Sequence, residues 1–211
     1  APASPAGEFK DMIMAKMNGV LSSKLGEING VLKGLLKSKD QVPLDIHHKK
    51  LNFNELIGMG SLSLTSIKAV AFTPPTITFE MAGDWSSALV IMGDAKGRDI
   101  GDLPITVDLN QVGFKTQSIV ATLDDNTGAI TQFAVSGVQV DIGSASAHVQ
   151  TAMPFLTRII SNLASEALEK RKGEIAGKMA GKATAALNKV FNDKVKGAIN
   201  EKMAAMMAKL R

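Results

Sequence analysis

The stretch TPPTITFEMAGD, Thr73–Asp84, decides the fold class, because it places an alternating apolar run between two groups of turn-forming residues. Ile77, Phe79 and Met81 occupy every second position, which is typical of a strand that buries one face. The proline pair before this run and the AGD after it are residues that commonly form turns. The stretch therefore predicts a short strand, bounded by turns, in the middle of the chain.

The same period of two extends in both directions, from about Leu51 to Val149. Turn residues such as GDAKGRD and DDNTG divide it into short pieces, and this pattern predicts an antiparallel meander. After Gly137 the apolar positions change parity, which predicts a glycine bulge that bends the last strand. The further alternating residues are Leu62, Leu64, Leu89, Ile91, Ile105, Val107, Leu109, Ile119, Ala121, Leu123, Phe133 and Val135, followed on the other parity by Val138, Val140 and Ile142.

Helical periodicity replaces this alternation at both ends of the chain. Residues 9–37 predict an amphipathic helix that ends at the polar, proline-containing SKDQVP. Residues 152–210 predict a longer helix, with Thr151 as its N-cap and Pro154 in its first turn. The charged run EKRKGE predicts a kink near residue 173.

These segments predict one elongated α+β domain over residues 9–211. The helix at 9–37 comes first, a bent antiparallel sheet follows at 50–150, and the long helix at 152–210 completes the domain. Residues 1–8 are expected to be disordered. Their Ala/Pro/Ser-rich sequence fits a mature N-terminus left by signal-peptide removal, and it fits an artificial start of the chain equally well.

Composition excludes several function classes. The chain of 211 residues has no cysteine, which rules out disulfides, thiol nucleophiles and CxxC zinc sites. A net charge of +4 is spread along the chain, and aromatic residues make up only 4%, so the stacking platforms and basic face of a nucleic-acid binder are missing. No apolar run is long enough to span a membrane.

Two ladders of glycines, each with a spacing of four, interrupt the predicted helices. Each glycine costs about 1 kcal/mol relative to alanine in a helix interior. At about 100° per residue, both ladders project away from the main apolar face of their helix. Either the two helices pack together through these small residues and form one wall of a cavity, or the glycines are exposed and weaken the helices. The ladders are Gly26, Gly30 and Gly34, and Gly173, Gly177 and Gly181.

Candidate catalytic and metal sites are weak. His47 and His48 are adjacent in what reads as a polar surface loop, and neither they nor His148 has a plausible orienting carboxylate for a hydrolase. The DDNTG segment lacks calcium-loop spacing and is better explained as a hairpin turn. The glycines at 58 and 60 and the GRDIGD segment lack the context of a phosphate loop. We therefore expect no catalytic residue, no metal and no cofactor, although a bound hydrophobic ligand or pigment is compatible with the sequence.

Methionine is frequent, with 11 residues, and its flexible side chain fills irregular space. Ordinary core packing explains such residues, but they could also line an adaptable cavity for an apolar ligand. The clusters are Met12, Met14 and Met17 in the first helix, Met59, Met81 and Met92 in the strand region, and Met203, Met206 and Met207 near the C-terminus.

Three stretches carry a family resemblance: FKDMIMAKMNGVL (9–21), FAVSGVQVDIG (133–143) and MPFLTRIISNLASEAL (153–168). Together with the order of helix, bent strands and long helix, they resemble the tubular lipid-binding (TULIP) superfamily. The likeness is to its small arthropod branch, the group-7 mite allergens, which lie close to the bactericidal/permeability-increasing protein and to the takeout and juvenile-hormone-binding proteins. The absence of the N-terminal disulfide found in takeout and hormone-binding relatives favours the mite-allergen-like branch.

The resemblance implies a curved sheet that wraps the long helix, with an apolar tunnel or groove between them that takes lipids or other hydrophobic molecules. It also implies secretion. The candidate lining is Ile13, Met17, Leu62, Leu64, Ile77, Phe79, Met81, Leu89, Ile91, Phe133, Val135, Leu156, Ile160 and Leu163.

The sequence thus predicts a secreted, non-enzymatic carrier or sensor of a lipid, isoprenoid or pigment. The alternative is a surface-active or structural protein whose amphipathic helices act at a water interface or membrane surface. A homodimer and transient contact with a membrane surface are compatible with either function, and no nucleic-acid partner is expected.

Overall fold

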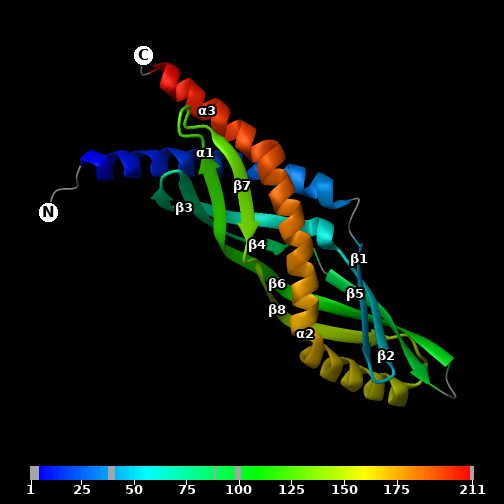
Figure 1. The fold of residues 1–211 in the computed structure, drawn as a ribbon. Helices are drawn as coiled ribbons and strands as arrows, with labels where there is room; N and C mark the ends of the chain where they lie inside the picture. Colours follow the sequence, from blue (N-terminus) through cyan, green and yellow to red (C-terminus); the bar gives the residue numbers. More distant parts are fainter. Residues whose placement is uncertain (1–4, 38–40, 88, 98–100, 210–211) are drawn as a thin grey trace.

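Two long helical segments flank an eight-stranded antiparallel sheet (Figure 1). The computed structural model describes residues 5–37, 41–87, 89–97 and 101–209. This arrangement confirms the α+β class and the predicted order of helix, bent sheet and long helix. The elements are α1 (Pro5–Lys37), β1 (Gln41–His48), β2 (Leu51–Ile57), the 3₁₀ turn η1 (Met59–Ser61), β3 (Leu62–Thr73), β4 (Thr76–Trp85), β5 (Leu89–Gly97), β6 (Gly101–Leu123), β7 (Ile130–Ser136), β8 (Gln139–Val149), α2 (Pro154–Val190), the π-helical η2 (Phe191–Val195) and α3 (Lys196–Lys209).

Strand β6 is the spine of the sheet. It is 23 residues long, and each of its edges pairs with two strands in succession. One edge pairs with β5 over 101–109 and then with β4 over 113–122. The other edge pairs with β8 over 105–115 and then with β7 over 118–123. The sheet therefore has two halves, β1-β2-β5-β6-β8 and β3-β4-β6-β7, which share this one strand.

The meander predicted from the sequence is wrong in its order, although every pairing is antiparallel. The strand order is β1-β2-β5-β6-β4-β3, so the hairpin β3–β4 leaves the first half and builds the second. The bend after β7 is present in a different form. A bulge within one strand was expected at Gly137. Instead, Gly137, at φ +64°, lies in the connection between two separate strands, β7 and β8, which both pair with the same edge of β6.

Two glycines predicted to lie in turns are in strand interiors. Gly83 lies in β4, and a Cβ at this position would be 2.4 Å from the ring of Phe114 and 2.3 Å from the carbonyl oxygen of Ser63. Gly93 lies in β5, where a Cβ would be 2.1 Å from the carbonyl oxygen of Asn52. Close approach of neighbouring groups therefore explains both residues. The DDNTG turn is confirmed, because Asp124 Oδ1 accepts backbone hydrogen bonds of 2.9 and 2.8 Å between β6 and β7.

The ends of the elements also differ from expectation. Residues 41–48, which were read as a polar linker and loop, form β1, so His47 and His48 lie at a strand end. Helix α1 begins at Pro5, inside the segment expected to be disordered, and residues 1–4 lie outside the described part. The residue that caps α2 is Met153, with no side-chain hydrogen bond, and Pro154 is in the first turn as predicted. Helical structure continues through residue 173, and Figure 1 shows α2 changing direction where its colour passes from yellow to orange.

Helix α2 crosses the first half of the sheet, with contacts to both edge strands, β8 and β1. On the β1 side, Lys178 Nζ donates to the Leu44 carbonyl, and Lys49 Nζ lies 3.2 Å from Glu166 Oε1. The buried face of the helical segment repeats every four residues. It consists of Ile175, Met179, Ala183, Leu187, Phe191, Val195 and Ile199.

Three asparagines beside this apolar row close the free edge of β7. Each side-chain amide pairs with both the N–H and the C=O of one residue of β7, as a neighbouring strand would. The donor–acceptor distances are 2.8 and 3.1 Å for Asn188 with Val135, 2.9 and 2.9 Å for Asn192 with Phe133, and 2.7 and 2.9 Å for Asn200 with Ile130.

The spacing of these asparagines follows from helix and strand geometry. From Asn188 to Asn192, four helical residues rise about 6.0 Å while two strand residues span about 6.7 Å. From Asn192 to Asn200, eight helical residues rise about 12 Å while three strand residues span about 10 Å, so the amides stay close to their partners. A four-residue step turns about 40° beyond one full turn, however, and would carry the amides away from the strand. The π-helical turn η2, which contains Asn192 and ends before Asn200, lowers the rotation per residue and corrects this drift.

Helix α1 closes the other outer edge of the second sheet half (β3-β4-β6-β7). This edge is β3, and two asparagines of α1 bond to it. Asn29 pairs with the N–H and C=O of Leu64 at 2.7 and 3.0 Å, and Asn18 accepts the N–H of Ala69 at 2.6 Å. Eleven helical residues rise about 16.5 Å and end about 20° from three full turns, and five strand residues span about the same length. Both outer edges of this half are therefore capped by side chains from helices.

The glycine ladders do not join the helices. A Cβ at any of these six positions would meet no atom within 4 Å, and all six residues are exposed. The packing explanation is therefore wrong, and the ladders place weak helix formers on the solvent side of α1 and α2. Contact between α1 and the C-terminal helices is real, but apolar side chains elsewhere make it.

Candidate hydrophobic ligand site

The predicted lining residues belong mostly to the filled core. Eleven of the fourteen are buried, whereas Ile13, Leu156 and Leu163 are partly buried. They come from both sheet halves and both helical segments, and all except Ile13 belong to one apolar cluster or pack against it. Among three hollows formed by the described residues, one is bordered by a member of this set, Leu62. Contact of these residues with a ligand stays a prediction.

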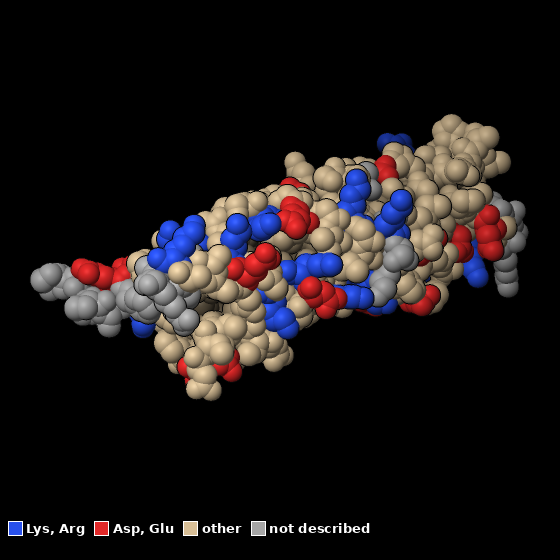
Figure 2. Space-filling model, turned by 90° about the horizontal axis from the view of Figure 1, so that it is seen from above, with Lys and Arg blue, Asp and Glu red and all other residues tan. Residues whose placement is uncertain are grey.

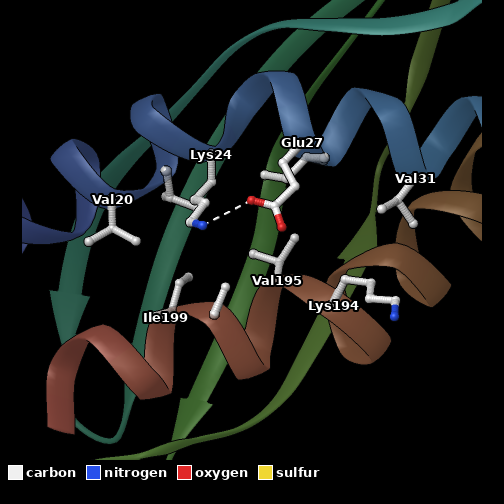
Figure 3. A pocket seen from close by; sticks show the side chains of 10 residues that line it. Val20, Lys24, Glu27, Val31, Lys194, Val195 and Ile199 are labelled. Atoms are coloured by element: carbon white, nitrogen blue, oxygen red, sulfur yellow. Dashed lines mark hydrogen bonds and ion pairs between the residues drawn. The ribbon is translucent and has the colours of Figure 1, made fainter. Parts of the chain in front are cut away.

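An apolar cavity of about 80 Å³ lies where α1 passes over η2 and α3 (Figure 3). We call this site the α1–α3 seam. Its residues on α1 follow one helical stripe, and those on the opposite wall continue the buried row of the C-terminal segment. The lining consists of Val20, Leu21, Lys24, Glu27, Ile28 and Val31 from α1, Lys194 and Val195 from η2, and Ala198 and Ile199 from α3.

The rim of the seam carries an ion pair that does not cross it. Lys24 Nζ and Glu27 Oε2 are 2.9 Å apart, and both belong to α1. The hydrogen bond to Glu27 raises the pKa of Lys24 above its ordinary value. Within the described residues, no hydrogen bond or ion pair joins the seam lining of α1 to that of η2 and α3. Apolar contact therefore closes the seam, and the charge of Glu201 on α3 attracts Lys24 at its rim without an ion pair.

Helical periodicity predicts an apolar face on each helical segment but does not indicate that these two faces meet. Val20, Leu21, Ile28 and Val31 repeat at helical spacing, which predicts that they face the core but not which element they contact. Leu21 and Ile28 are buried, and Val20 and Val31 are partly buried. A usable signal is the pair of polar residues Lys24 and Glu27 within that stripe. They mark a place where the buried face of α1 reaches the surface.

The methionines divide between core and surface. Met17, Met59 and Met81 are buried in the core, whereas Met12 and Met92 are exposed. The side chains of Met206 and Met207 lie outside the described part. Met14 and Met203 are partly buried and pack against the core, so core packing explains five of the clustered methionines. None of the described methionines lines the seam.

Exposed apolar side chains gather at the start of α2, at the end of the molecule away from both termini (Figure 1). Met153 is 60% exposed, Phe155 73% and Ile159 40%. They cover no part of the core. None of the described helices contains a continuous apolar segment of the length required to cross a bilayer.

Charged groups in the described ranges form no cluster that could hold a metal ion. No three His, Cys, Asp or Glu side chains come together there. His47 Nδ1 lies 2.5 Å from Asn52 Oδ1, and His148 Nε2 lies 3.0 Å from Asp108 Oδ2 on a different part of the sheet. On the face drawn in Figure 2, Lys and Arg are interspersed with Asp and Glu, so this face carries no extended patch of positive charge alone.

No protein-family model and no curated protein sequence matches the chain. Among solved structures, it is similar to the crystal structure of lipopolysaccharide binding protein, with a TM-score of 0.46 and 12% identity over 87% of this chain. The matched region spans 40% of that protein's length. TULIP membership, and the arthropod branch within it, stay predictions.

Proposed function

We propose that the protein binds a hydrophobic small molecule, such as a lipid, isoprenoid or pigment, at the α1–α3 seam, and that it does so without catalysing a reaction. The observation that carries this proposal is the apolar cavity at the seam, which opens to the surface next to the core. Secretion of the protein is part of the proposal and rests on the family resemblance of the sequence alone.

Binding at the seam requires α1 to move. A cavity of about 80 Å³ is well below the several hundred Å³ of most small-molecule sites. Three features favour this movement. Within the described residues, no hydrogen bond or ion pair joins the seam lining of α1 to that of α3, and the side-chain amides that bond α1 to β3 are those of Asn18 and Asn29. In addition, three exposed glycines weaken the helix. The core side chains behind the seam are mostly aliphatic and can repack around a ligand.

Apolar burial alone supplies enough free energy for useful affinity. A ligand that buries about 300 Å² of apolar surface gains roughly 7 kcal/mol, which is close to the roughly 8 kcal/mol of a micromolar complex. Displacing α1 offsets part of this gain. Affinity is therefore expected to rise with the length of the ligand's hydrocarbon chain.

A seam-filling variant tests the proposal. Ala198→Phe places a ring in the cavity, and Ala205→Phe places the same ring at an exposed position two turns further along α3, outside the seam lining. Binding of a fluorescent fatty acid is expected to weaken at least tenfold in the first variant and less than twofold in the second. Equal binding by both, with both folded by circular dichroism, would exclude the seam.

A reversible lock provides a second test in this cysteine-free chain. Glu27→Cys with Lys194→Cys places thiols on exposed positions of the two walls, where a short cleavable bis-thiol linker can join them. The linked protein is expected to lose fatty-acid binding and to regain it when the linker is cleaved. Retention of full binding in the linked state would show that α1 does not open at this point.

The exposed apolar group at the start of α2 favours the second candidate function, contact with a water interface or membrane surface. Phe155→Ser together with Met153→Ser removes the two most exposed members of this group without touching the seam. The double variant is expected to lose insertion into lipid monolayers and to keep fatty-acid binding. If the double variant still inserts into lipid monolayers, the surface-contact function is excluded.

A further inference from the structure

A second hollow lies on the other side of α1, and its chemistry differs from that of the seam. It is an open groove of about 670 Å³ between the last turns of α1, the turn η1 and the start of β3, with Ser86 and Ser87 at its rim. Lys33 and Lys37 line it from α1. We call it the lysine–serine groove. At about 100° per residue, these lysines lie roughly opposite the seam stripe on the helix.

The two lysines carry uncompensated charge. They are four residues apart on one helix face, a spacing at which like charges repel. Neither ammonium makes a hydrogen bond or ion pair within the described ranges, and no Asp or Glu is among the described lining residues. The C-terminal dipole of α1 favours Lys37 in the last turn but acts less on Lys33, one turn earlier. A bound dianion would relieve this repulsion.

The rest of the groove offers hydroxyl groups. The Ser63 and Ser87 hydroxyls make no hydrogen bond in the described structure. Ser86 Oγ makes only a long hydrogen bond of 3.3 Å, to the Ser61 carbonyl. Leu62 is the single large apolar residue of the lining, and it is 2% exposed. The surface that a ligand would meet is therefore polar.

The volume indicates more than an inorganic anion. At about 670 Å³, the groove lies in the range of sites for small organic ligands. Two ammonium groups fit a phosphate monoester, and free serine hydroxyls on the opposite wall fit the hydroxyls of a polyol. We propose that the lysine–serine groove binds a phosphorylated polyol, such as an inositol phosphate or a sugar phosphate.

The experiment uses inositol 4-phosphate as the soluble probe, followed by calorimetry and by amide chemical shifts. The variant Lys33→Ala with Lys37→Ala is compared with Lys10→Ala with Lys16→Ala, which removes two exposed lysines from the same helix outside the groove. Binding is expected to weaken at least tenfold in the groove variant and less than twofold in the control. Shifts are expected at Ser63 and Ser87.

Equal weakening in the two lysine variants would overturn the site, because it would show that charge acts from anywhere on α1. Absence of binding at millimolar probe would overturn it as well. Vesicles of phosphatidylcholine with and without phosphatidylinositol 4-phosphate distinguish a lipid headgroup from a free polyol phosphate, since only a headgroup site binds the doped vesicles. The seam-filling Ala198→Phe should leave probe binding unchanged, so this inference and the proposed function fail separately.

Discussion

The two outer edges of the second sheet half are both closed by asparagine side chains, but to different extents. On β7, the amides of Asn188, Asn192 and Asn200 pair with both backbone groups of three residues. On β3, one amide of α1 makes such a pair and a second makes a single bond. The C-terminal helices are therefore fastened more firmly, and α1 is the element that can leave the sheet at lower cost.

The most damaging change should be in the firmer edge. Asn192→Ala leaves the N–H and C=O of Phe133 without partners in a partly buried place, and it is expected to cost about 2–4 kcal/mol of unfolding free energy. Chemical denaturation measures this loss. Asn126→Ala in the exposed β6–β7 turn is the control and should cost less than about 0.5 kcal/mol. A loss below about 1 kcal/mol at position 192 would mean that solvent replaces the amide.

The same change in the weaker edge should act locally. Asn29→Ala removes the amide pair with Leu64 and is expected to cost about 1–2 kcal/mol. Hydrogen exchange is expected to accelerate in α1 and β3 while β7 keeps its protection, because α1 opens without the rest of the sheet. Uniform acceleration over both edges would contradict the difference between them.

Exposed glycines should respond in the opposite direction. Gly177→Ala is expected to stabilise the protein by about 0.5–1 kcal/mol, because a Cβ at this position meets no atom within 4 Å and alanine is the better helix former. Thermal unfolding measures the gain as a rise of about 1–4 °C. Gly30→Ala should also slow the opening of α1. Gly83→Ala provides the contrast, since its Cβ would collide with Phe114 and lower the melting temperature.

The smallest expected effect is on the stability of the protein at low pH. Hydrogen bonds from Thr127 and Asn126 lower the pKa of Asp124, and Lys170 followed by Lys49 lowers that of Glu166. A lowered carboxyl pKa gives stability that is present above the unfolded-state pKa and is lost as pH falls through the folded-state pKa. Asp124→Asn and Glu166→Gln should therefore each weaken the fall in stability below about pH 4. An unchanged acid limb in both variants would show that these exposed groups do not contribute.

The order of elements could be predicted from the sequence because it depends on local periodicity. The burial pattern of β4, with Ile77, Phe79 and Met81 inside, follows directly from a period of two. Its end could not be predicted, because Gly83 reads as a turn residue unless the ring of Phe114 on a distant strand is known. The continuity of β6 was hidden for a similar reason. The alternation of buried and exposed residues in β6 changes parity near Gln111, which has φ 54°. The segments before and after this residue therefore read as two separate strands.

The candidate site was less predictable than the fold. Burial of the proposed lining was correctly expected for most residues, but whether buried residues surround a hollow depends on how closely distant elements pack. The seam arises from the crossing of α1 with η2 and α3, and a single sequence does not record that crossing. One signal was available: Asn188, Asn192 and Asn200 are poor helix formers at multiples of four inside a helix, a spacing that needs a partner outside it.

The π-helical turn at 191–195 sets the phase of everything that follows it. Deleting one residue there would restore ordinary helical hydrogen bonds and rotate the last turns by about 100°. Asn200 would then lose β7, and Ile199 would swing away from α1, so one edge cap and one wall of the seam would fail together. The length of a five-residue segment, independent of its composition, thus couples the closure of the sheet to the shape of the proposed ligand site.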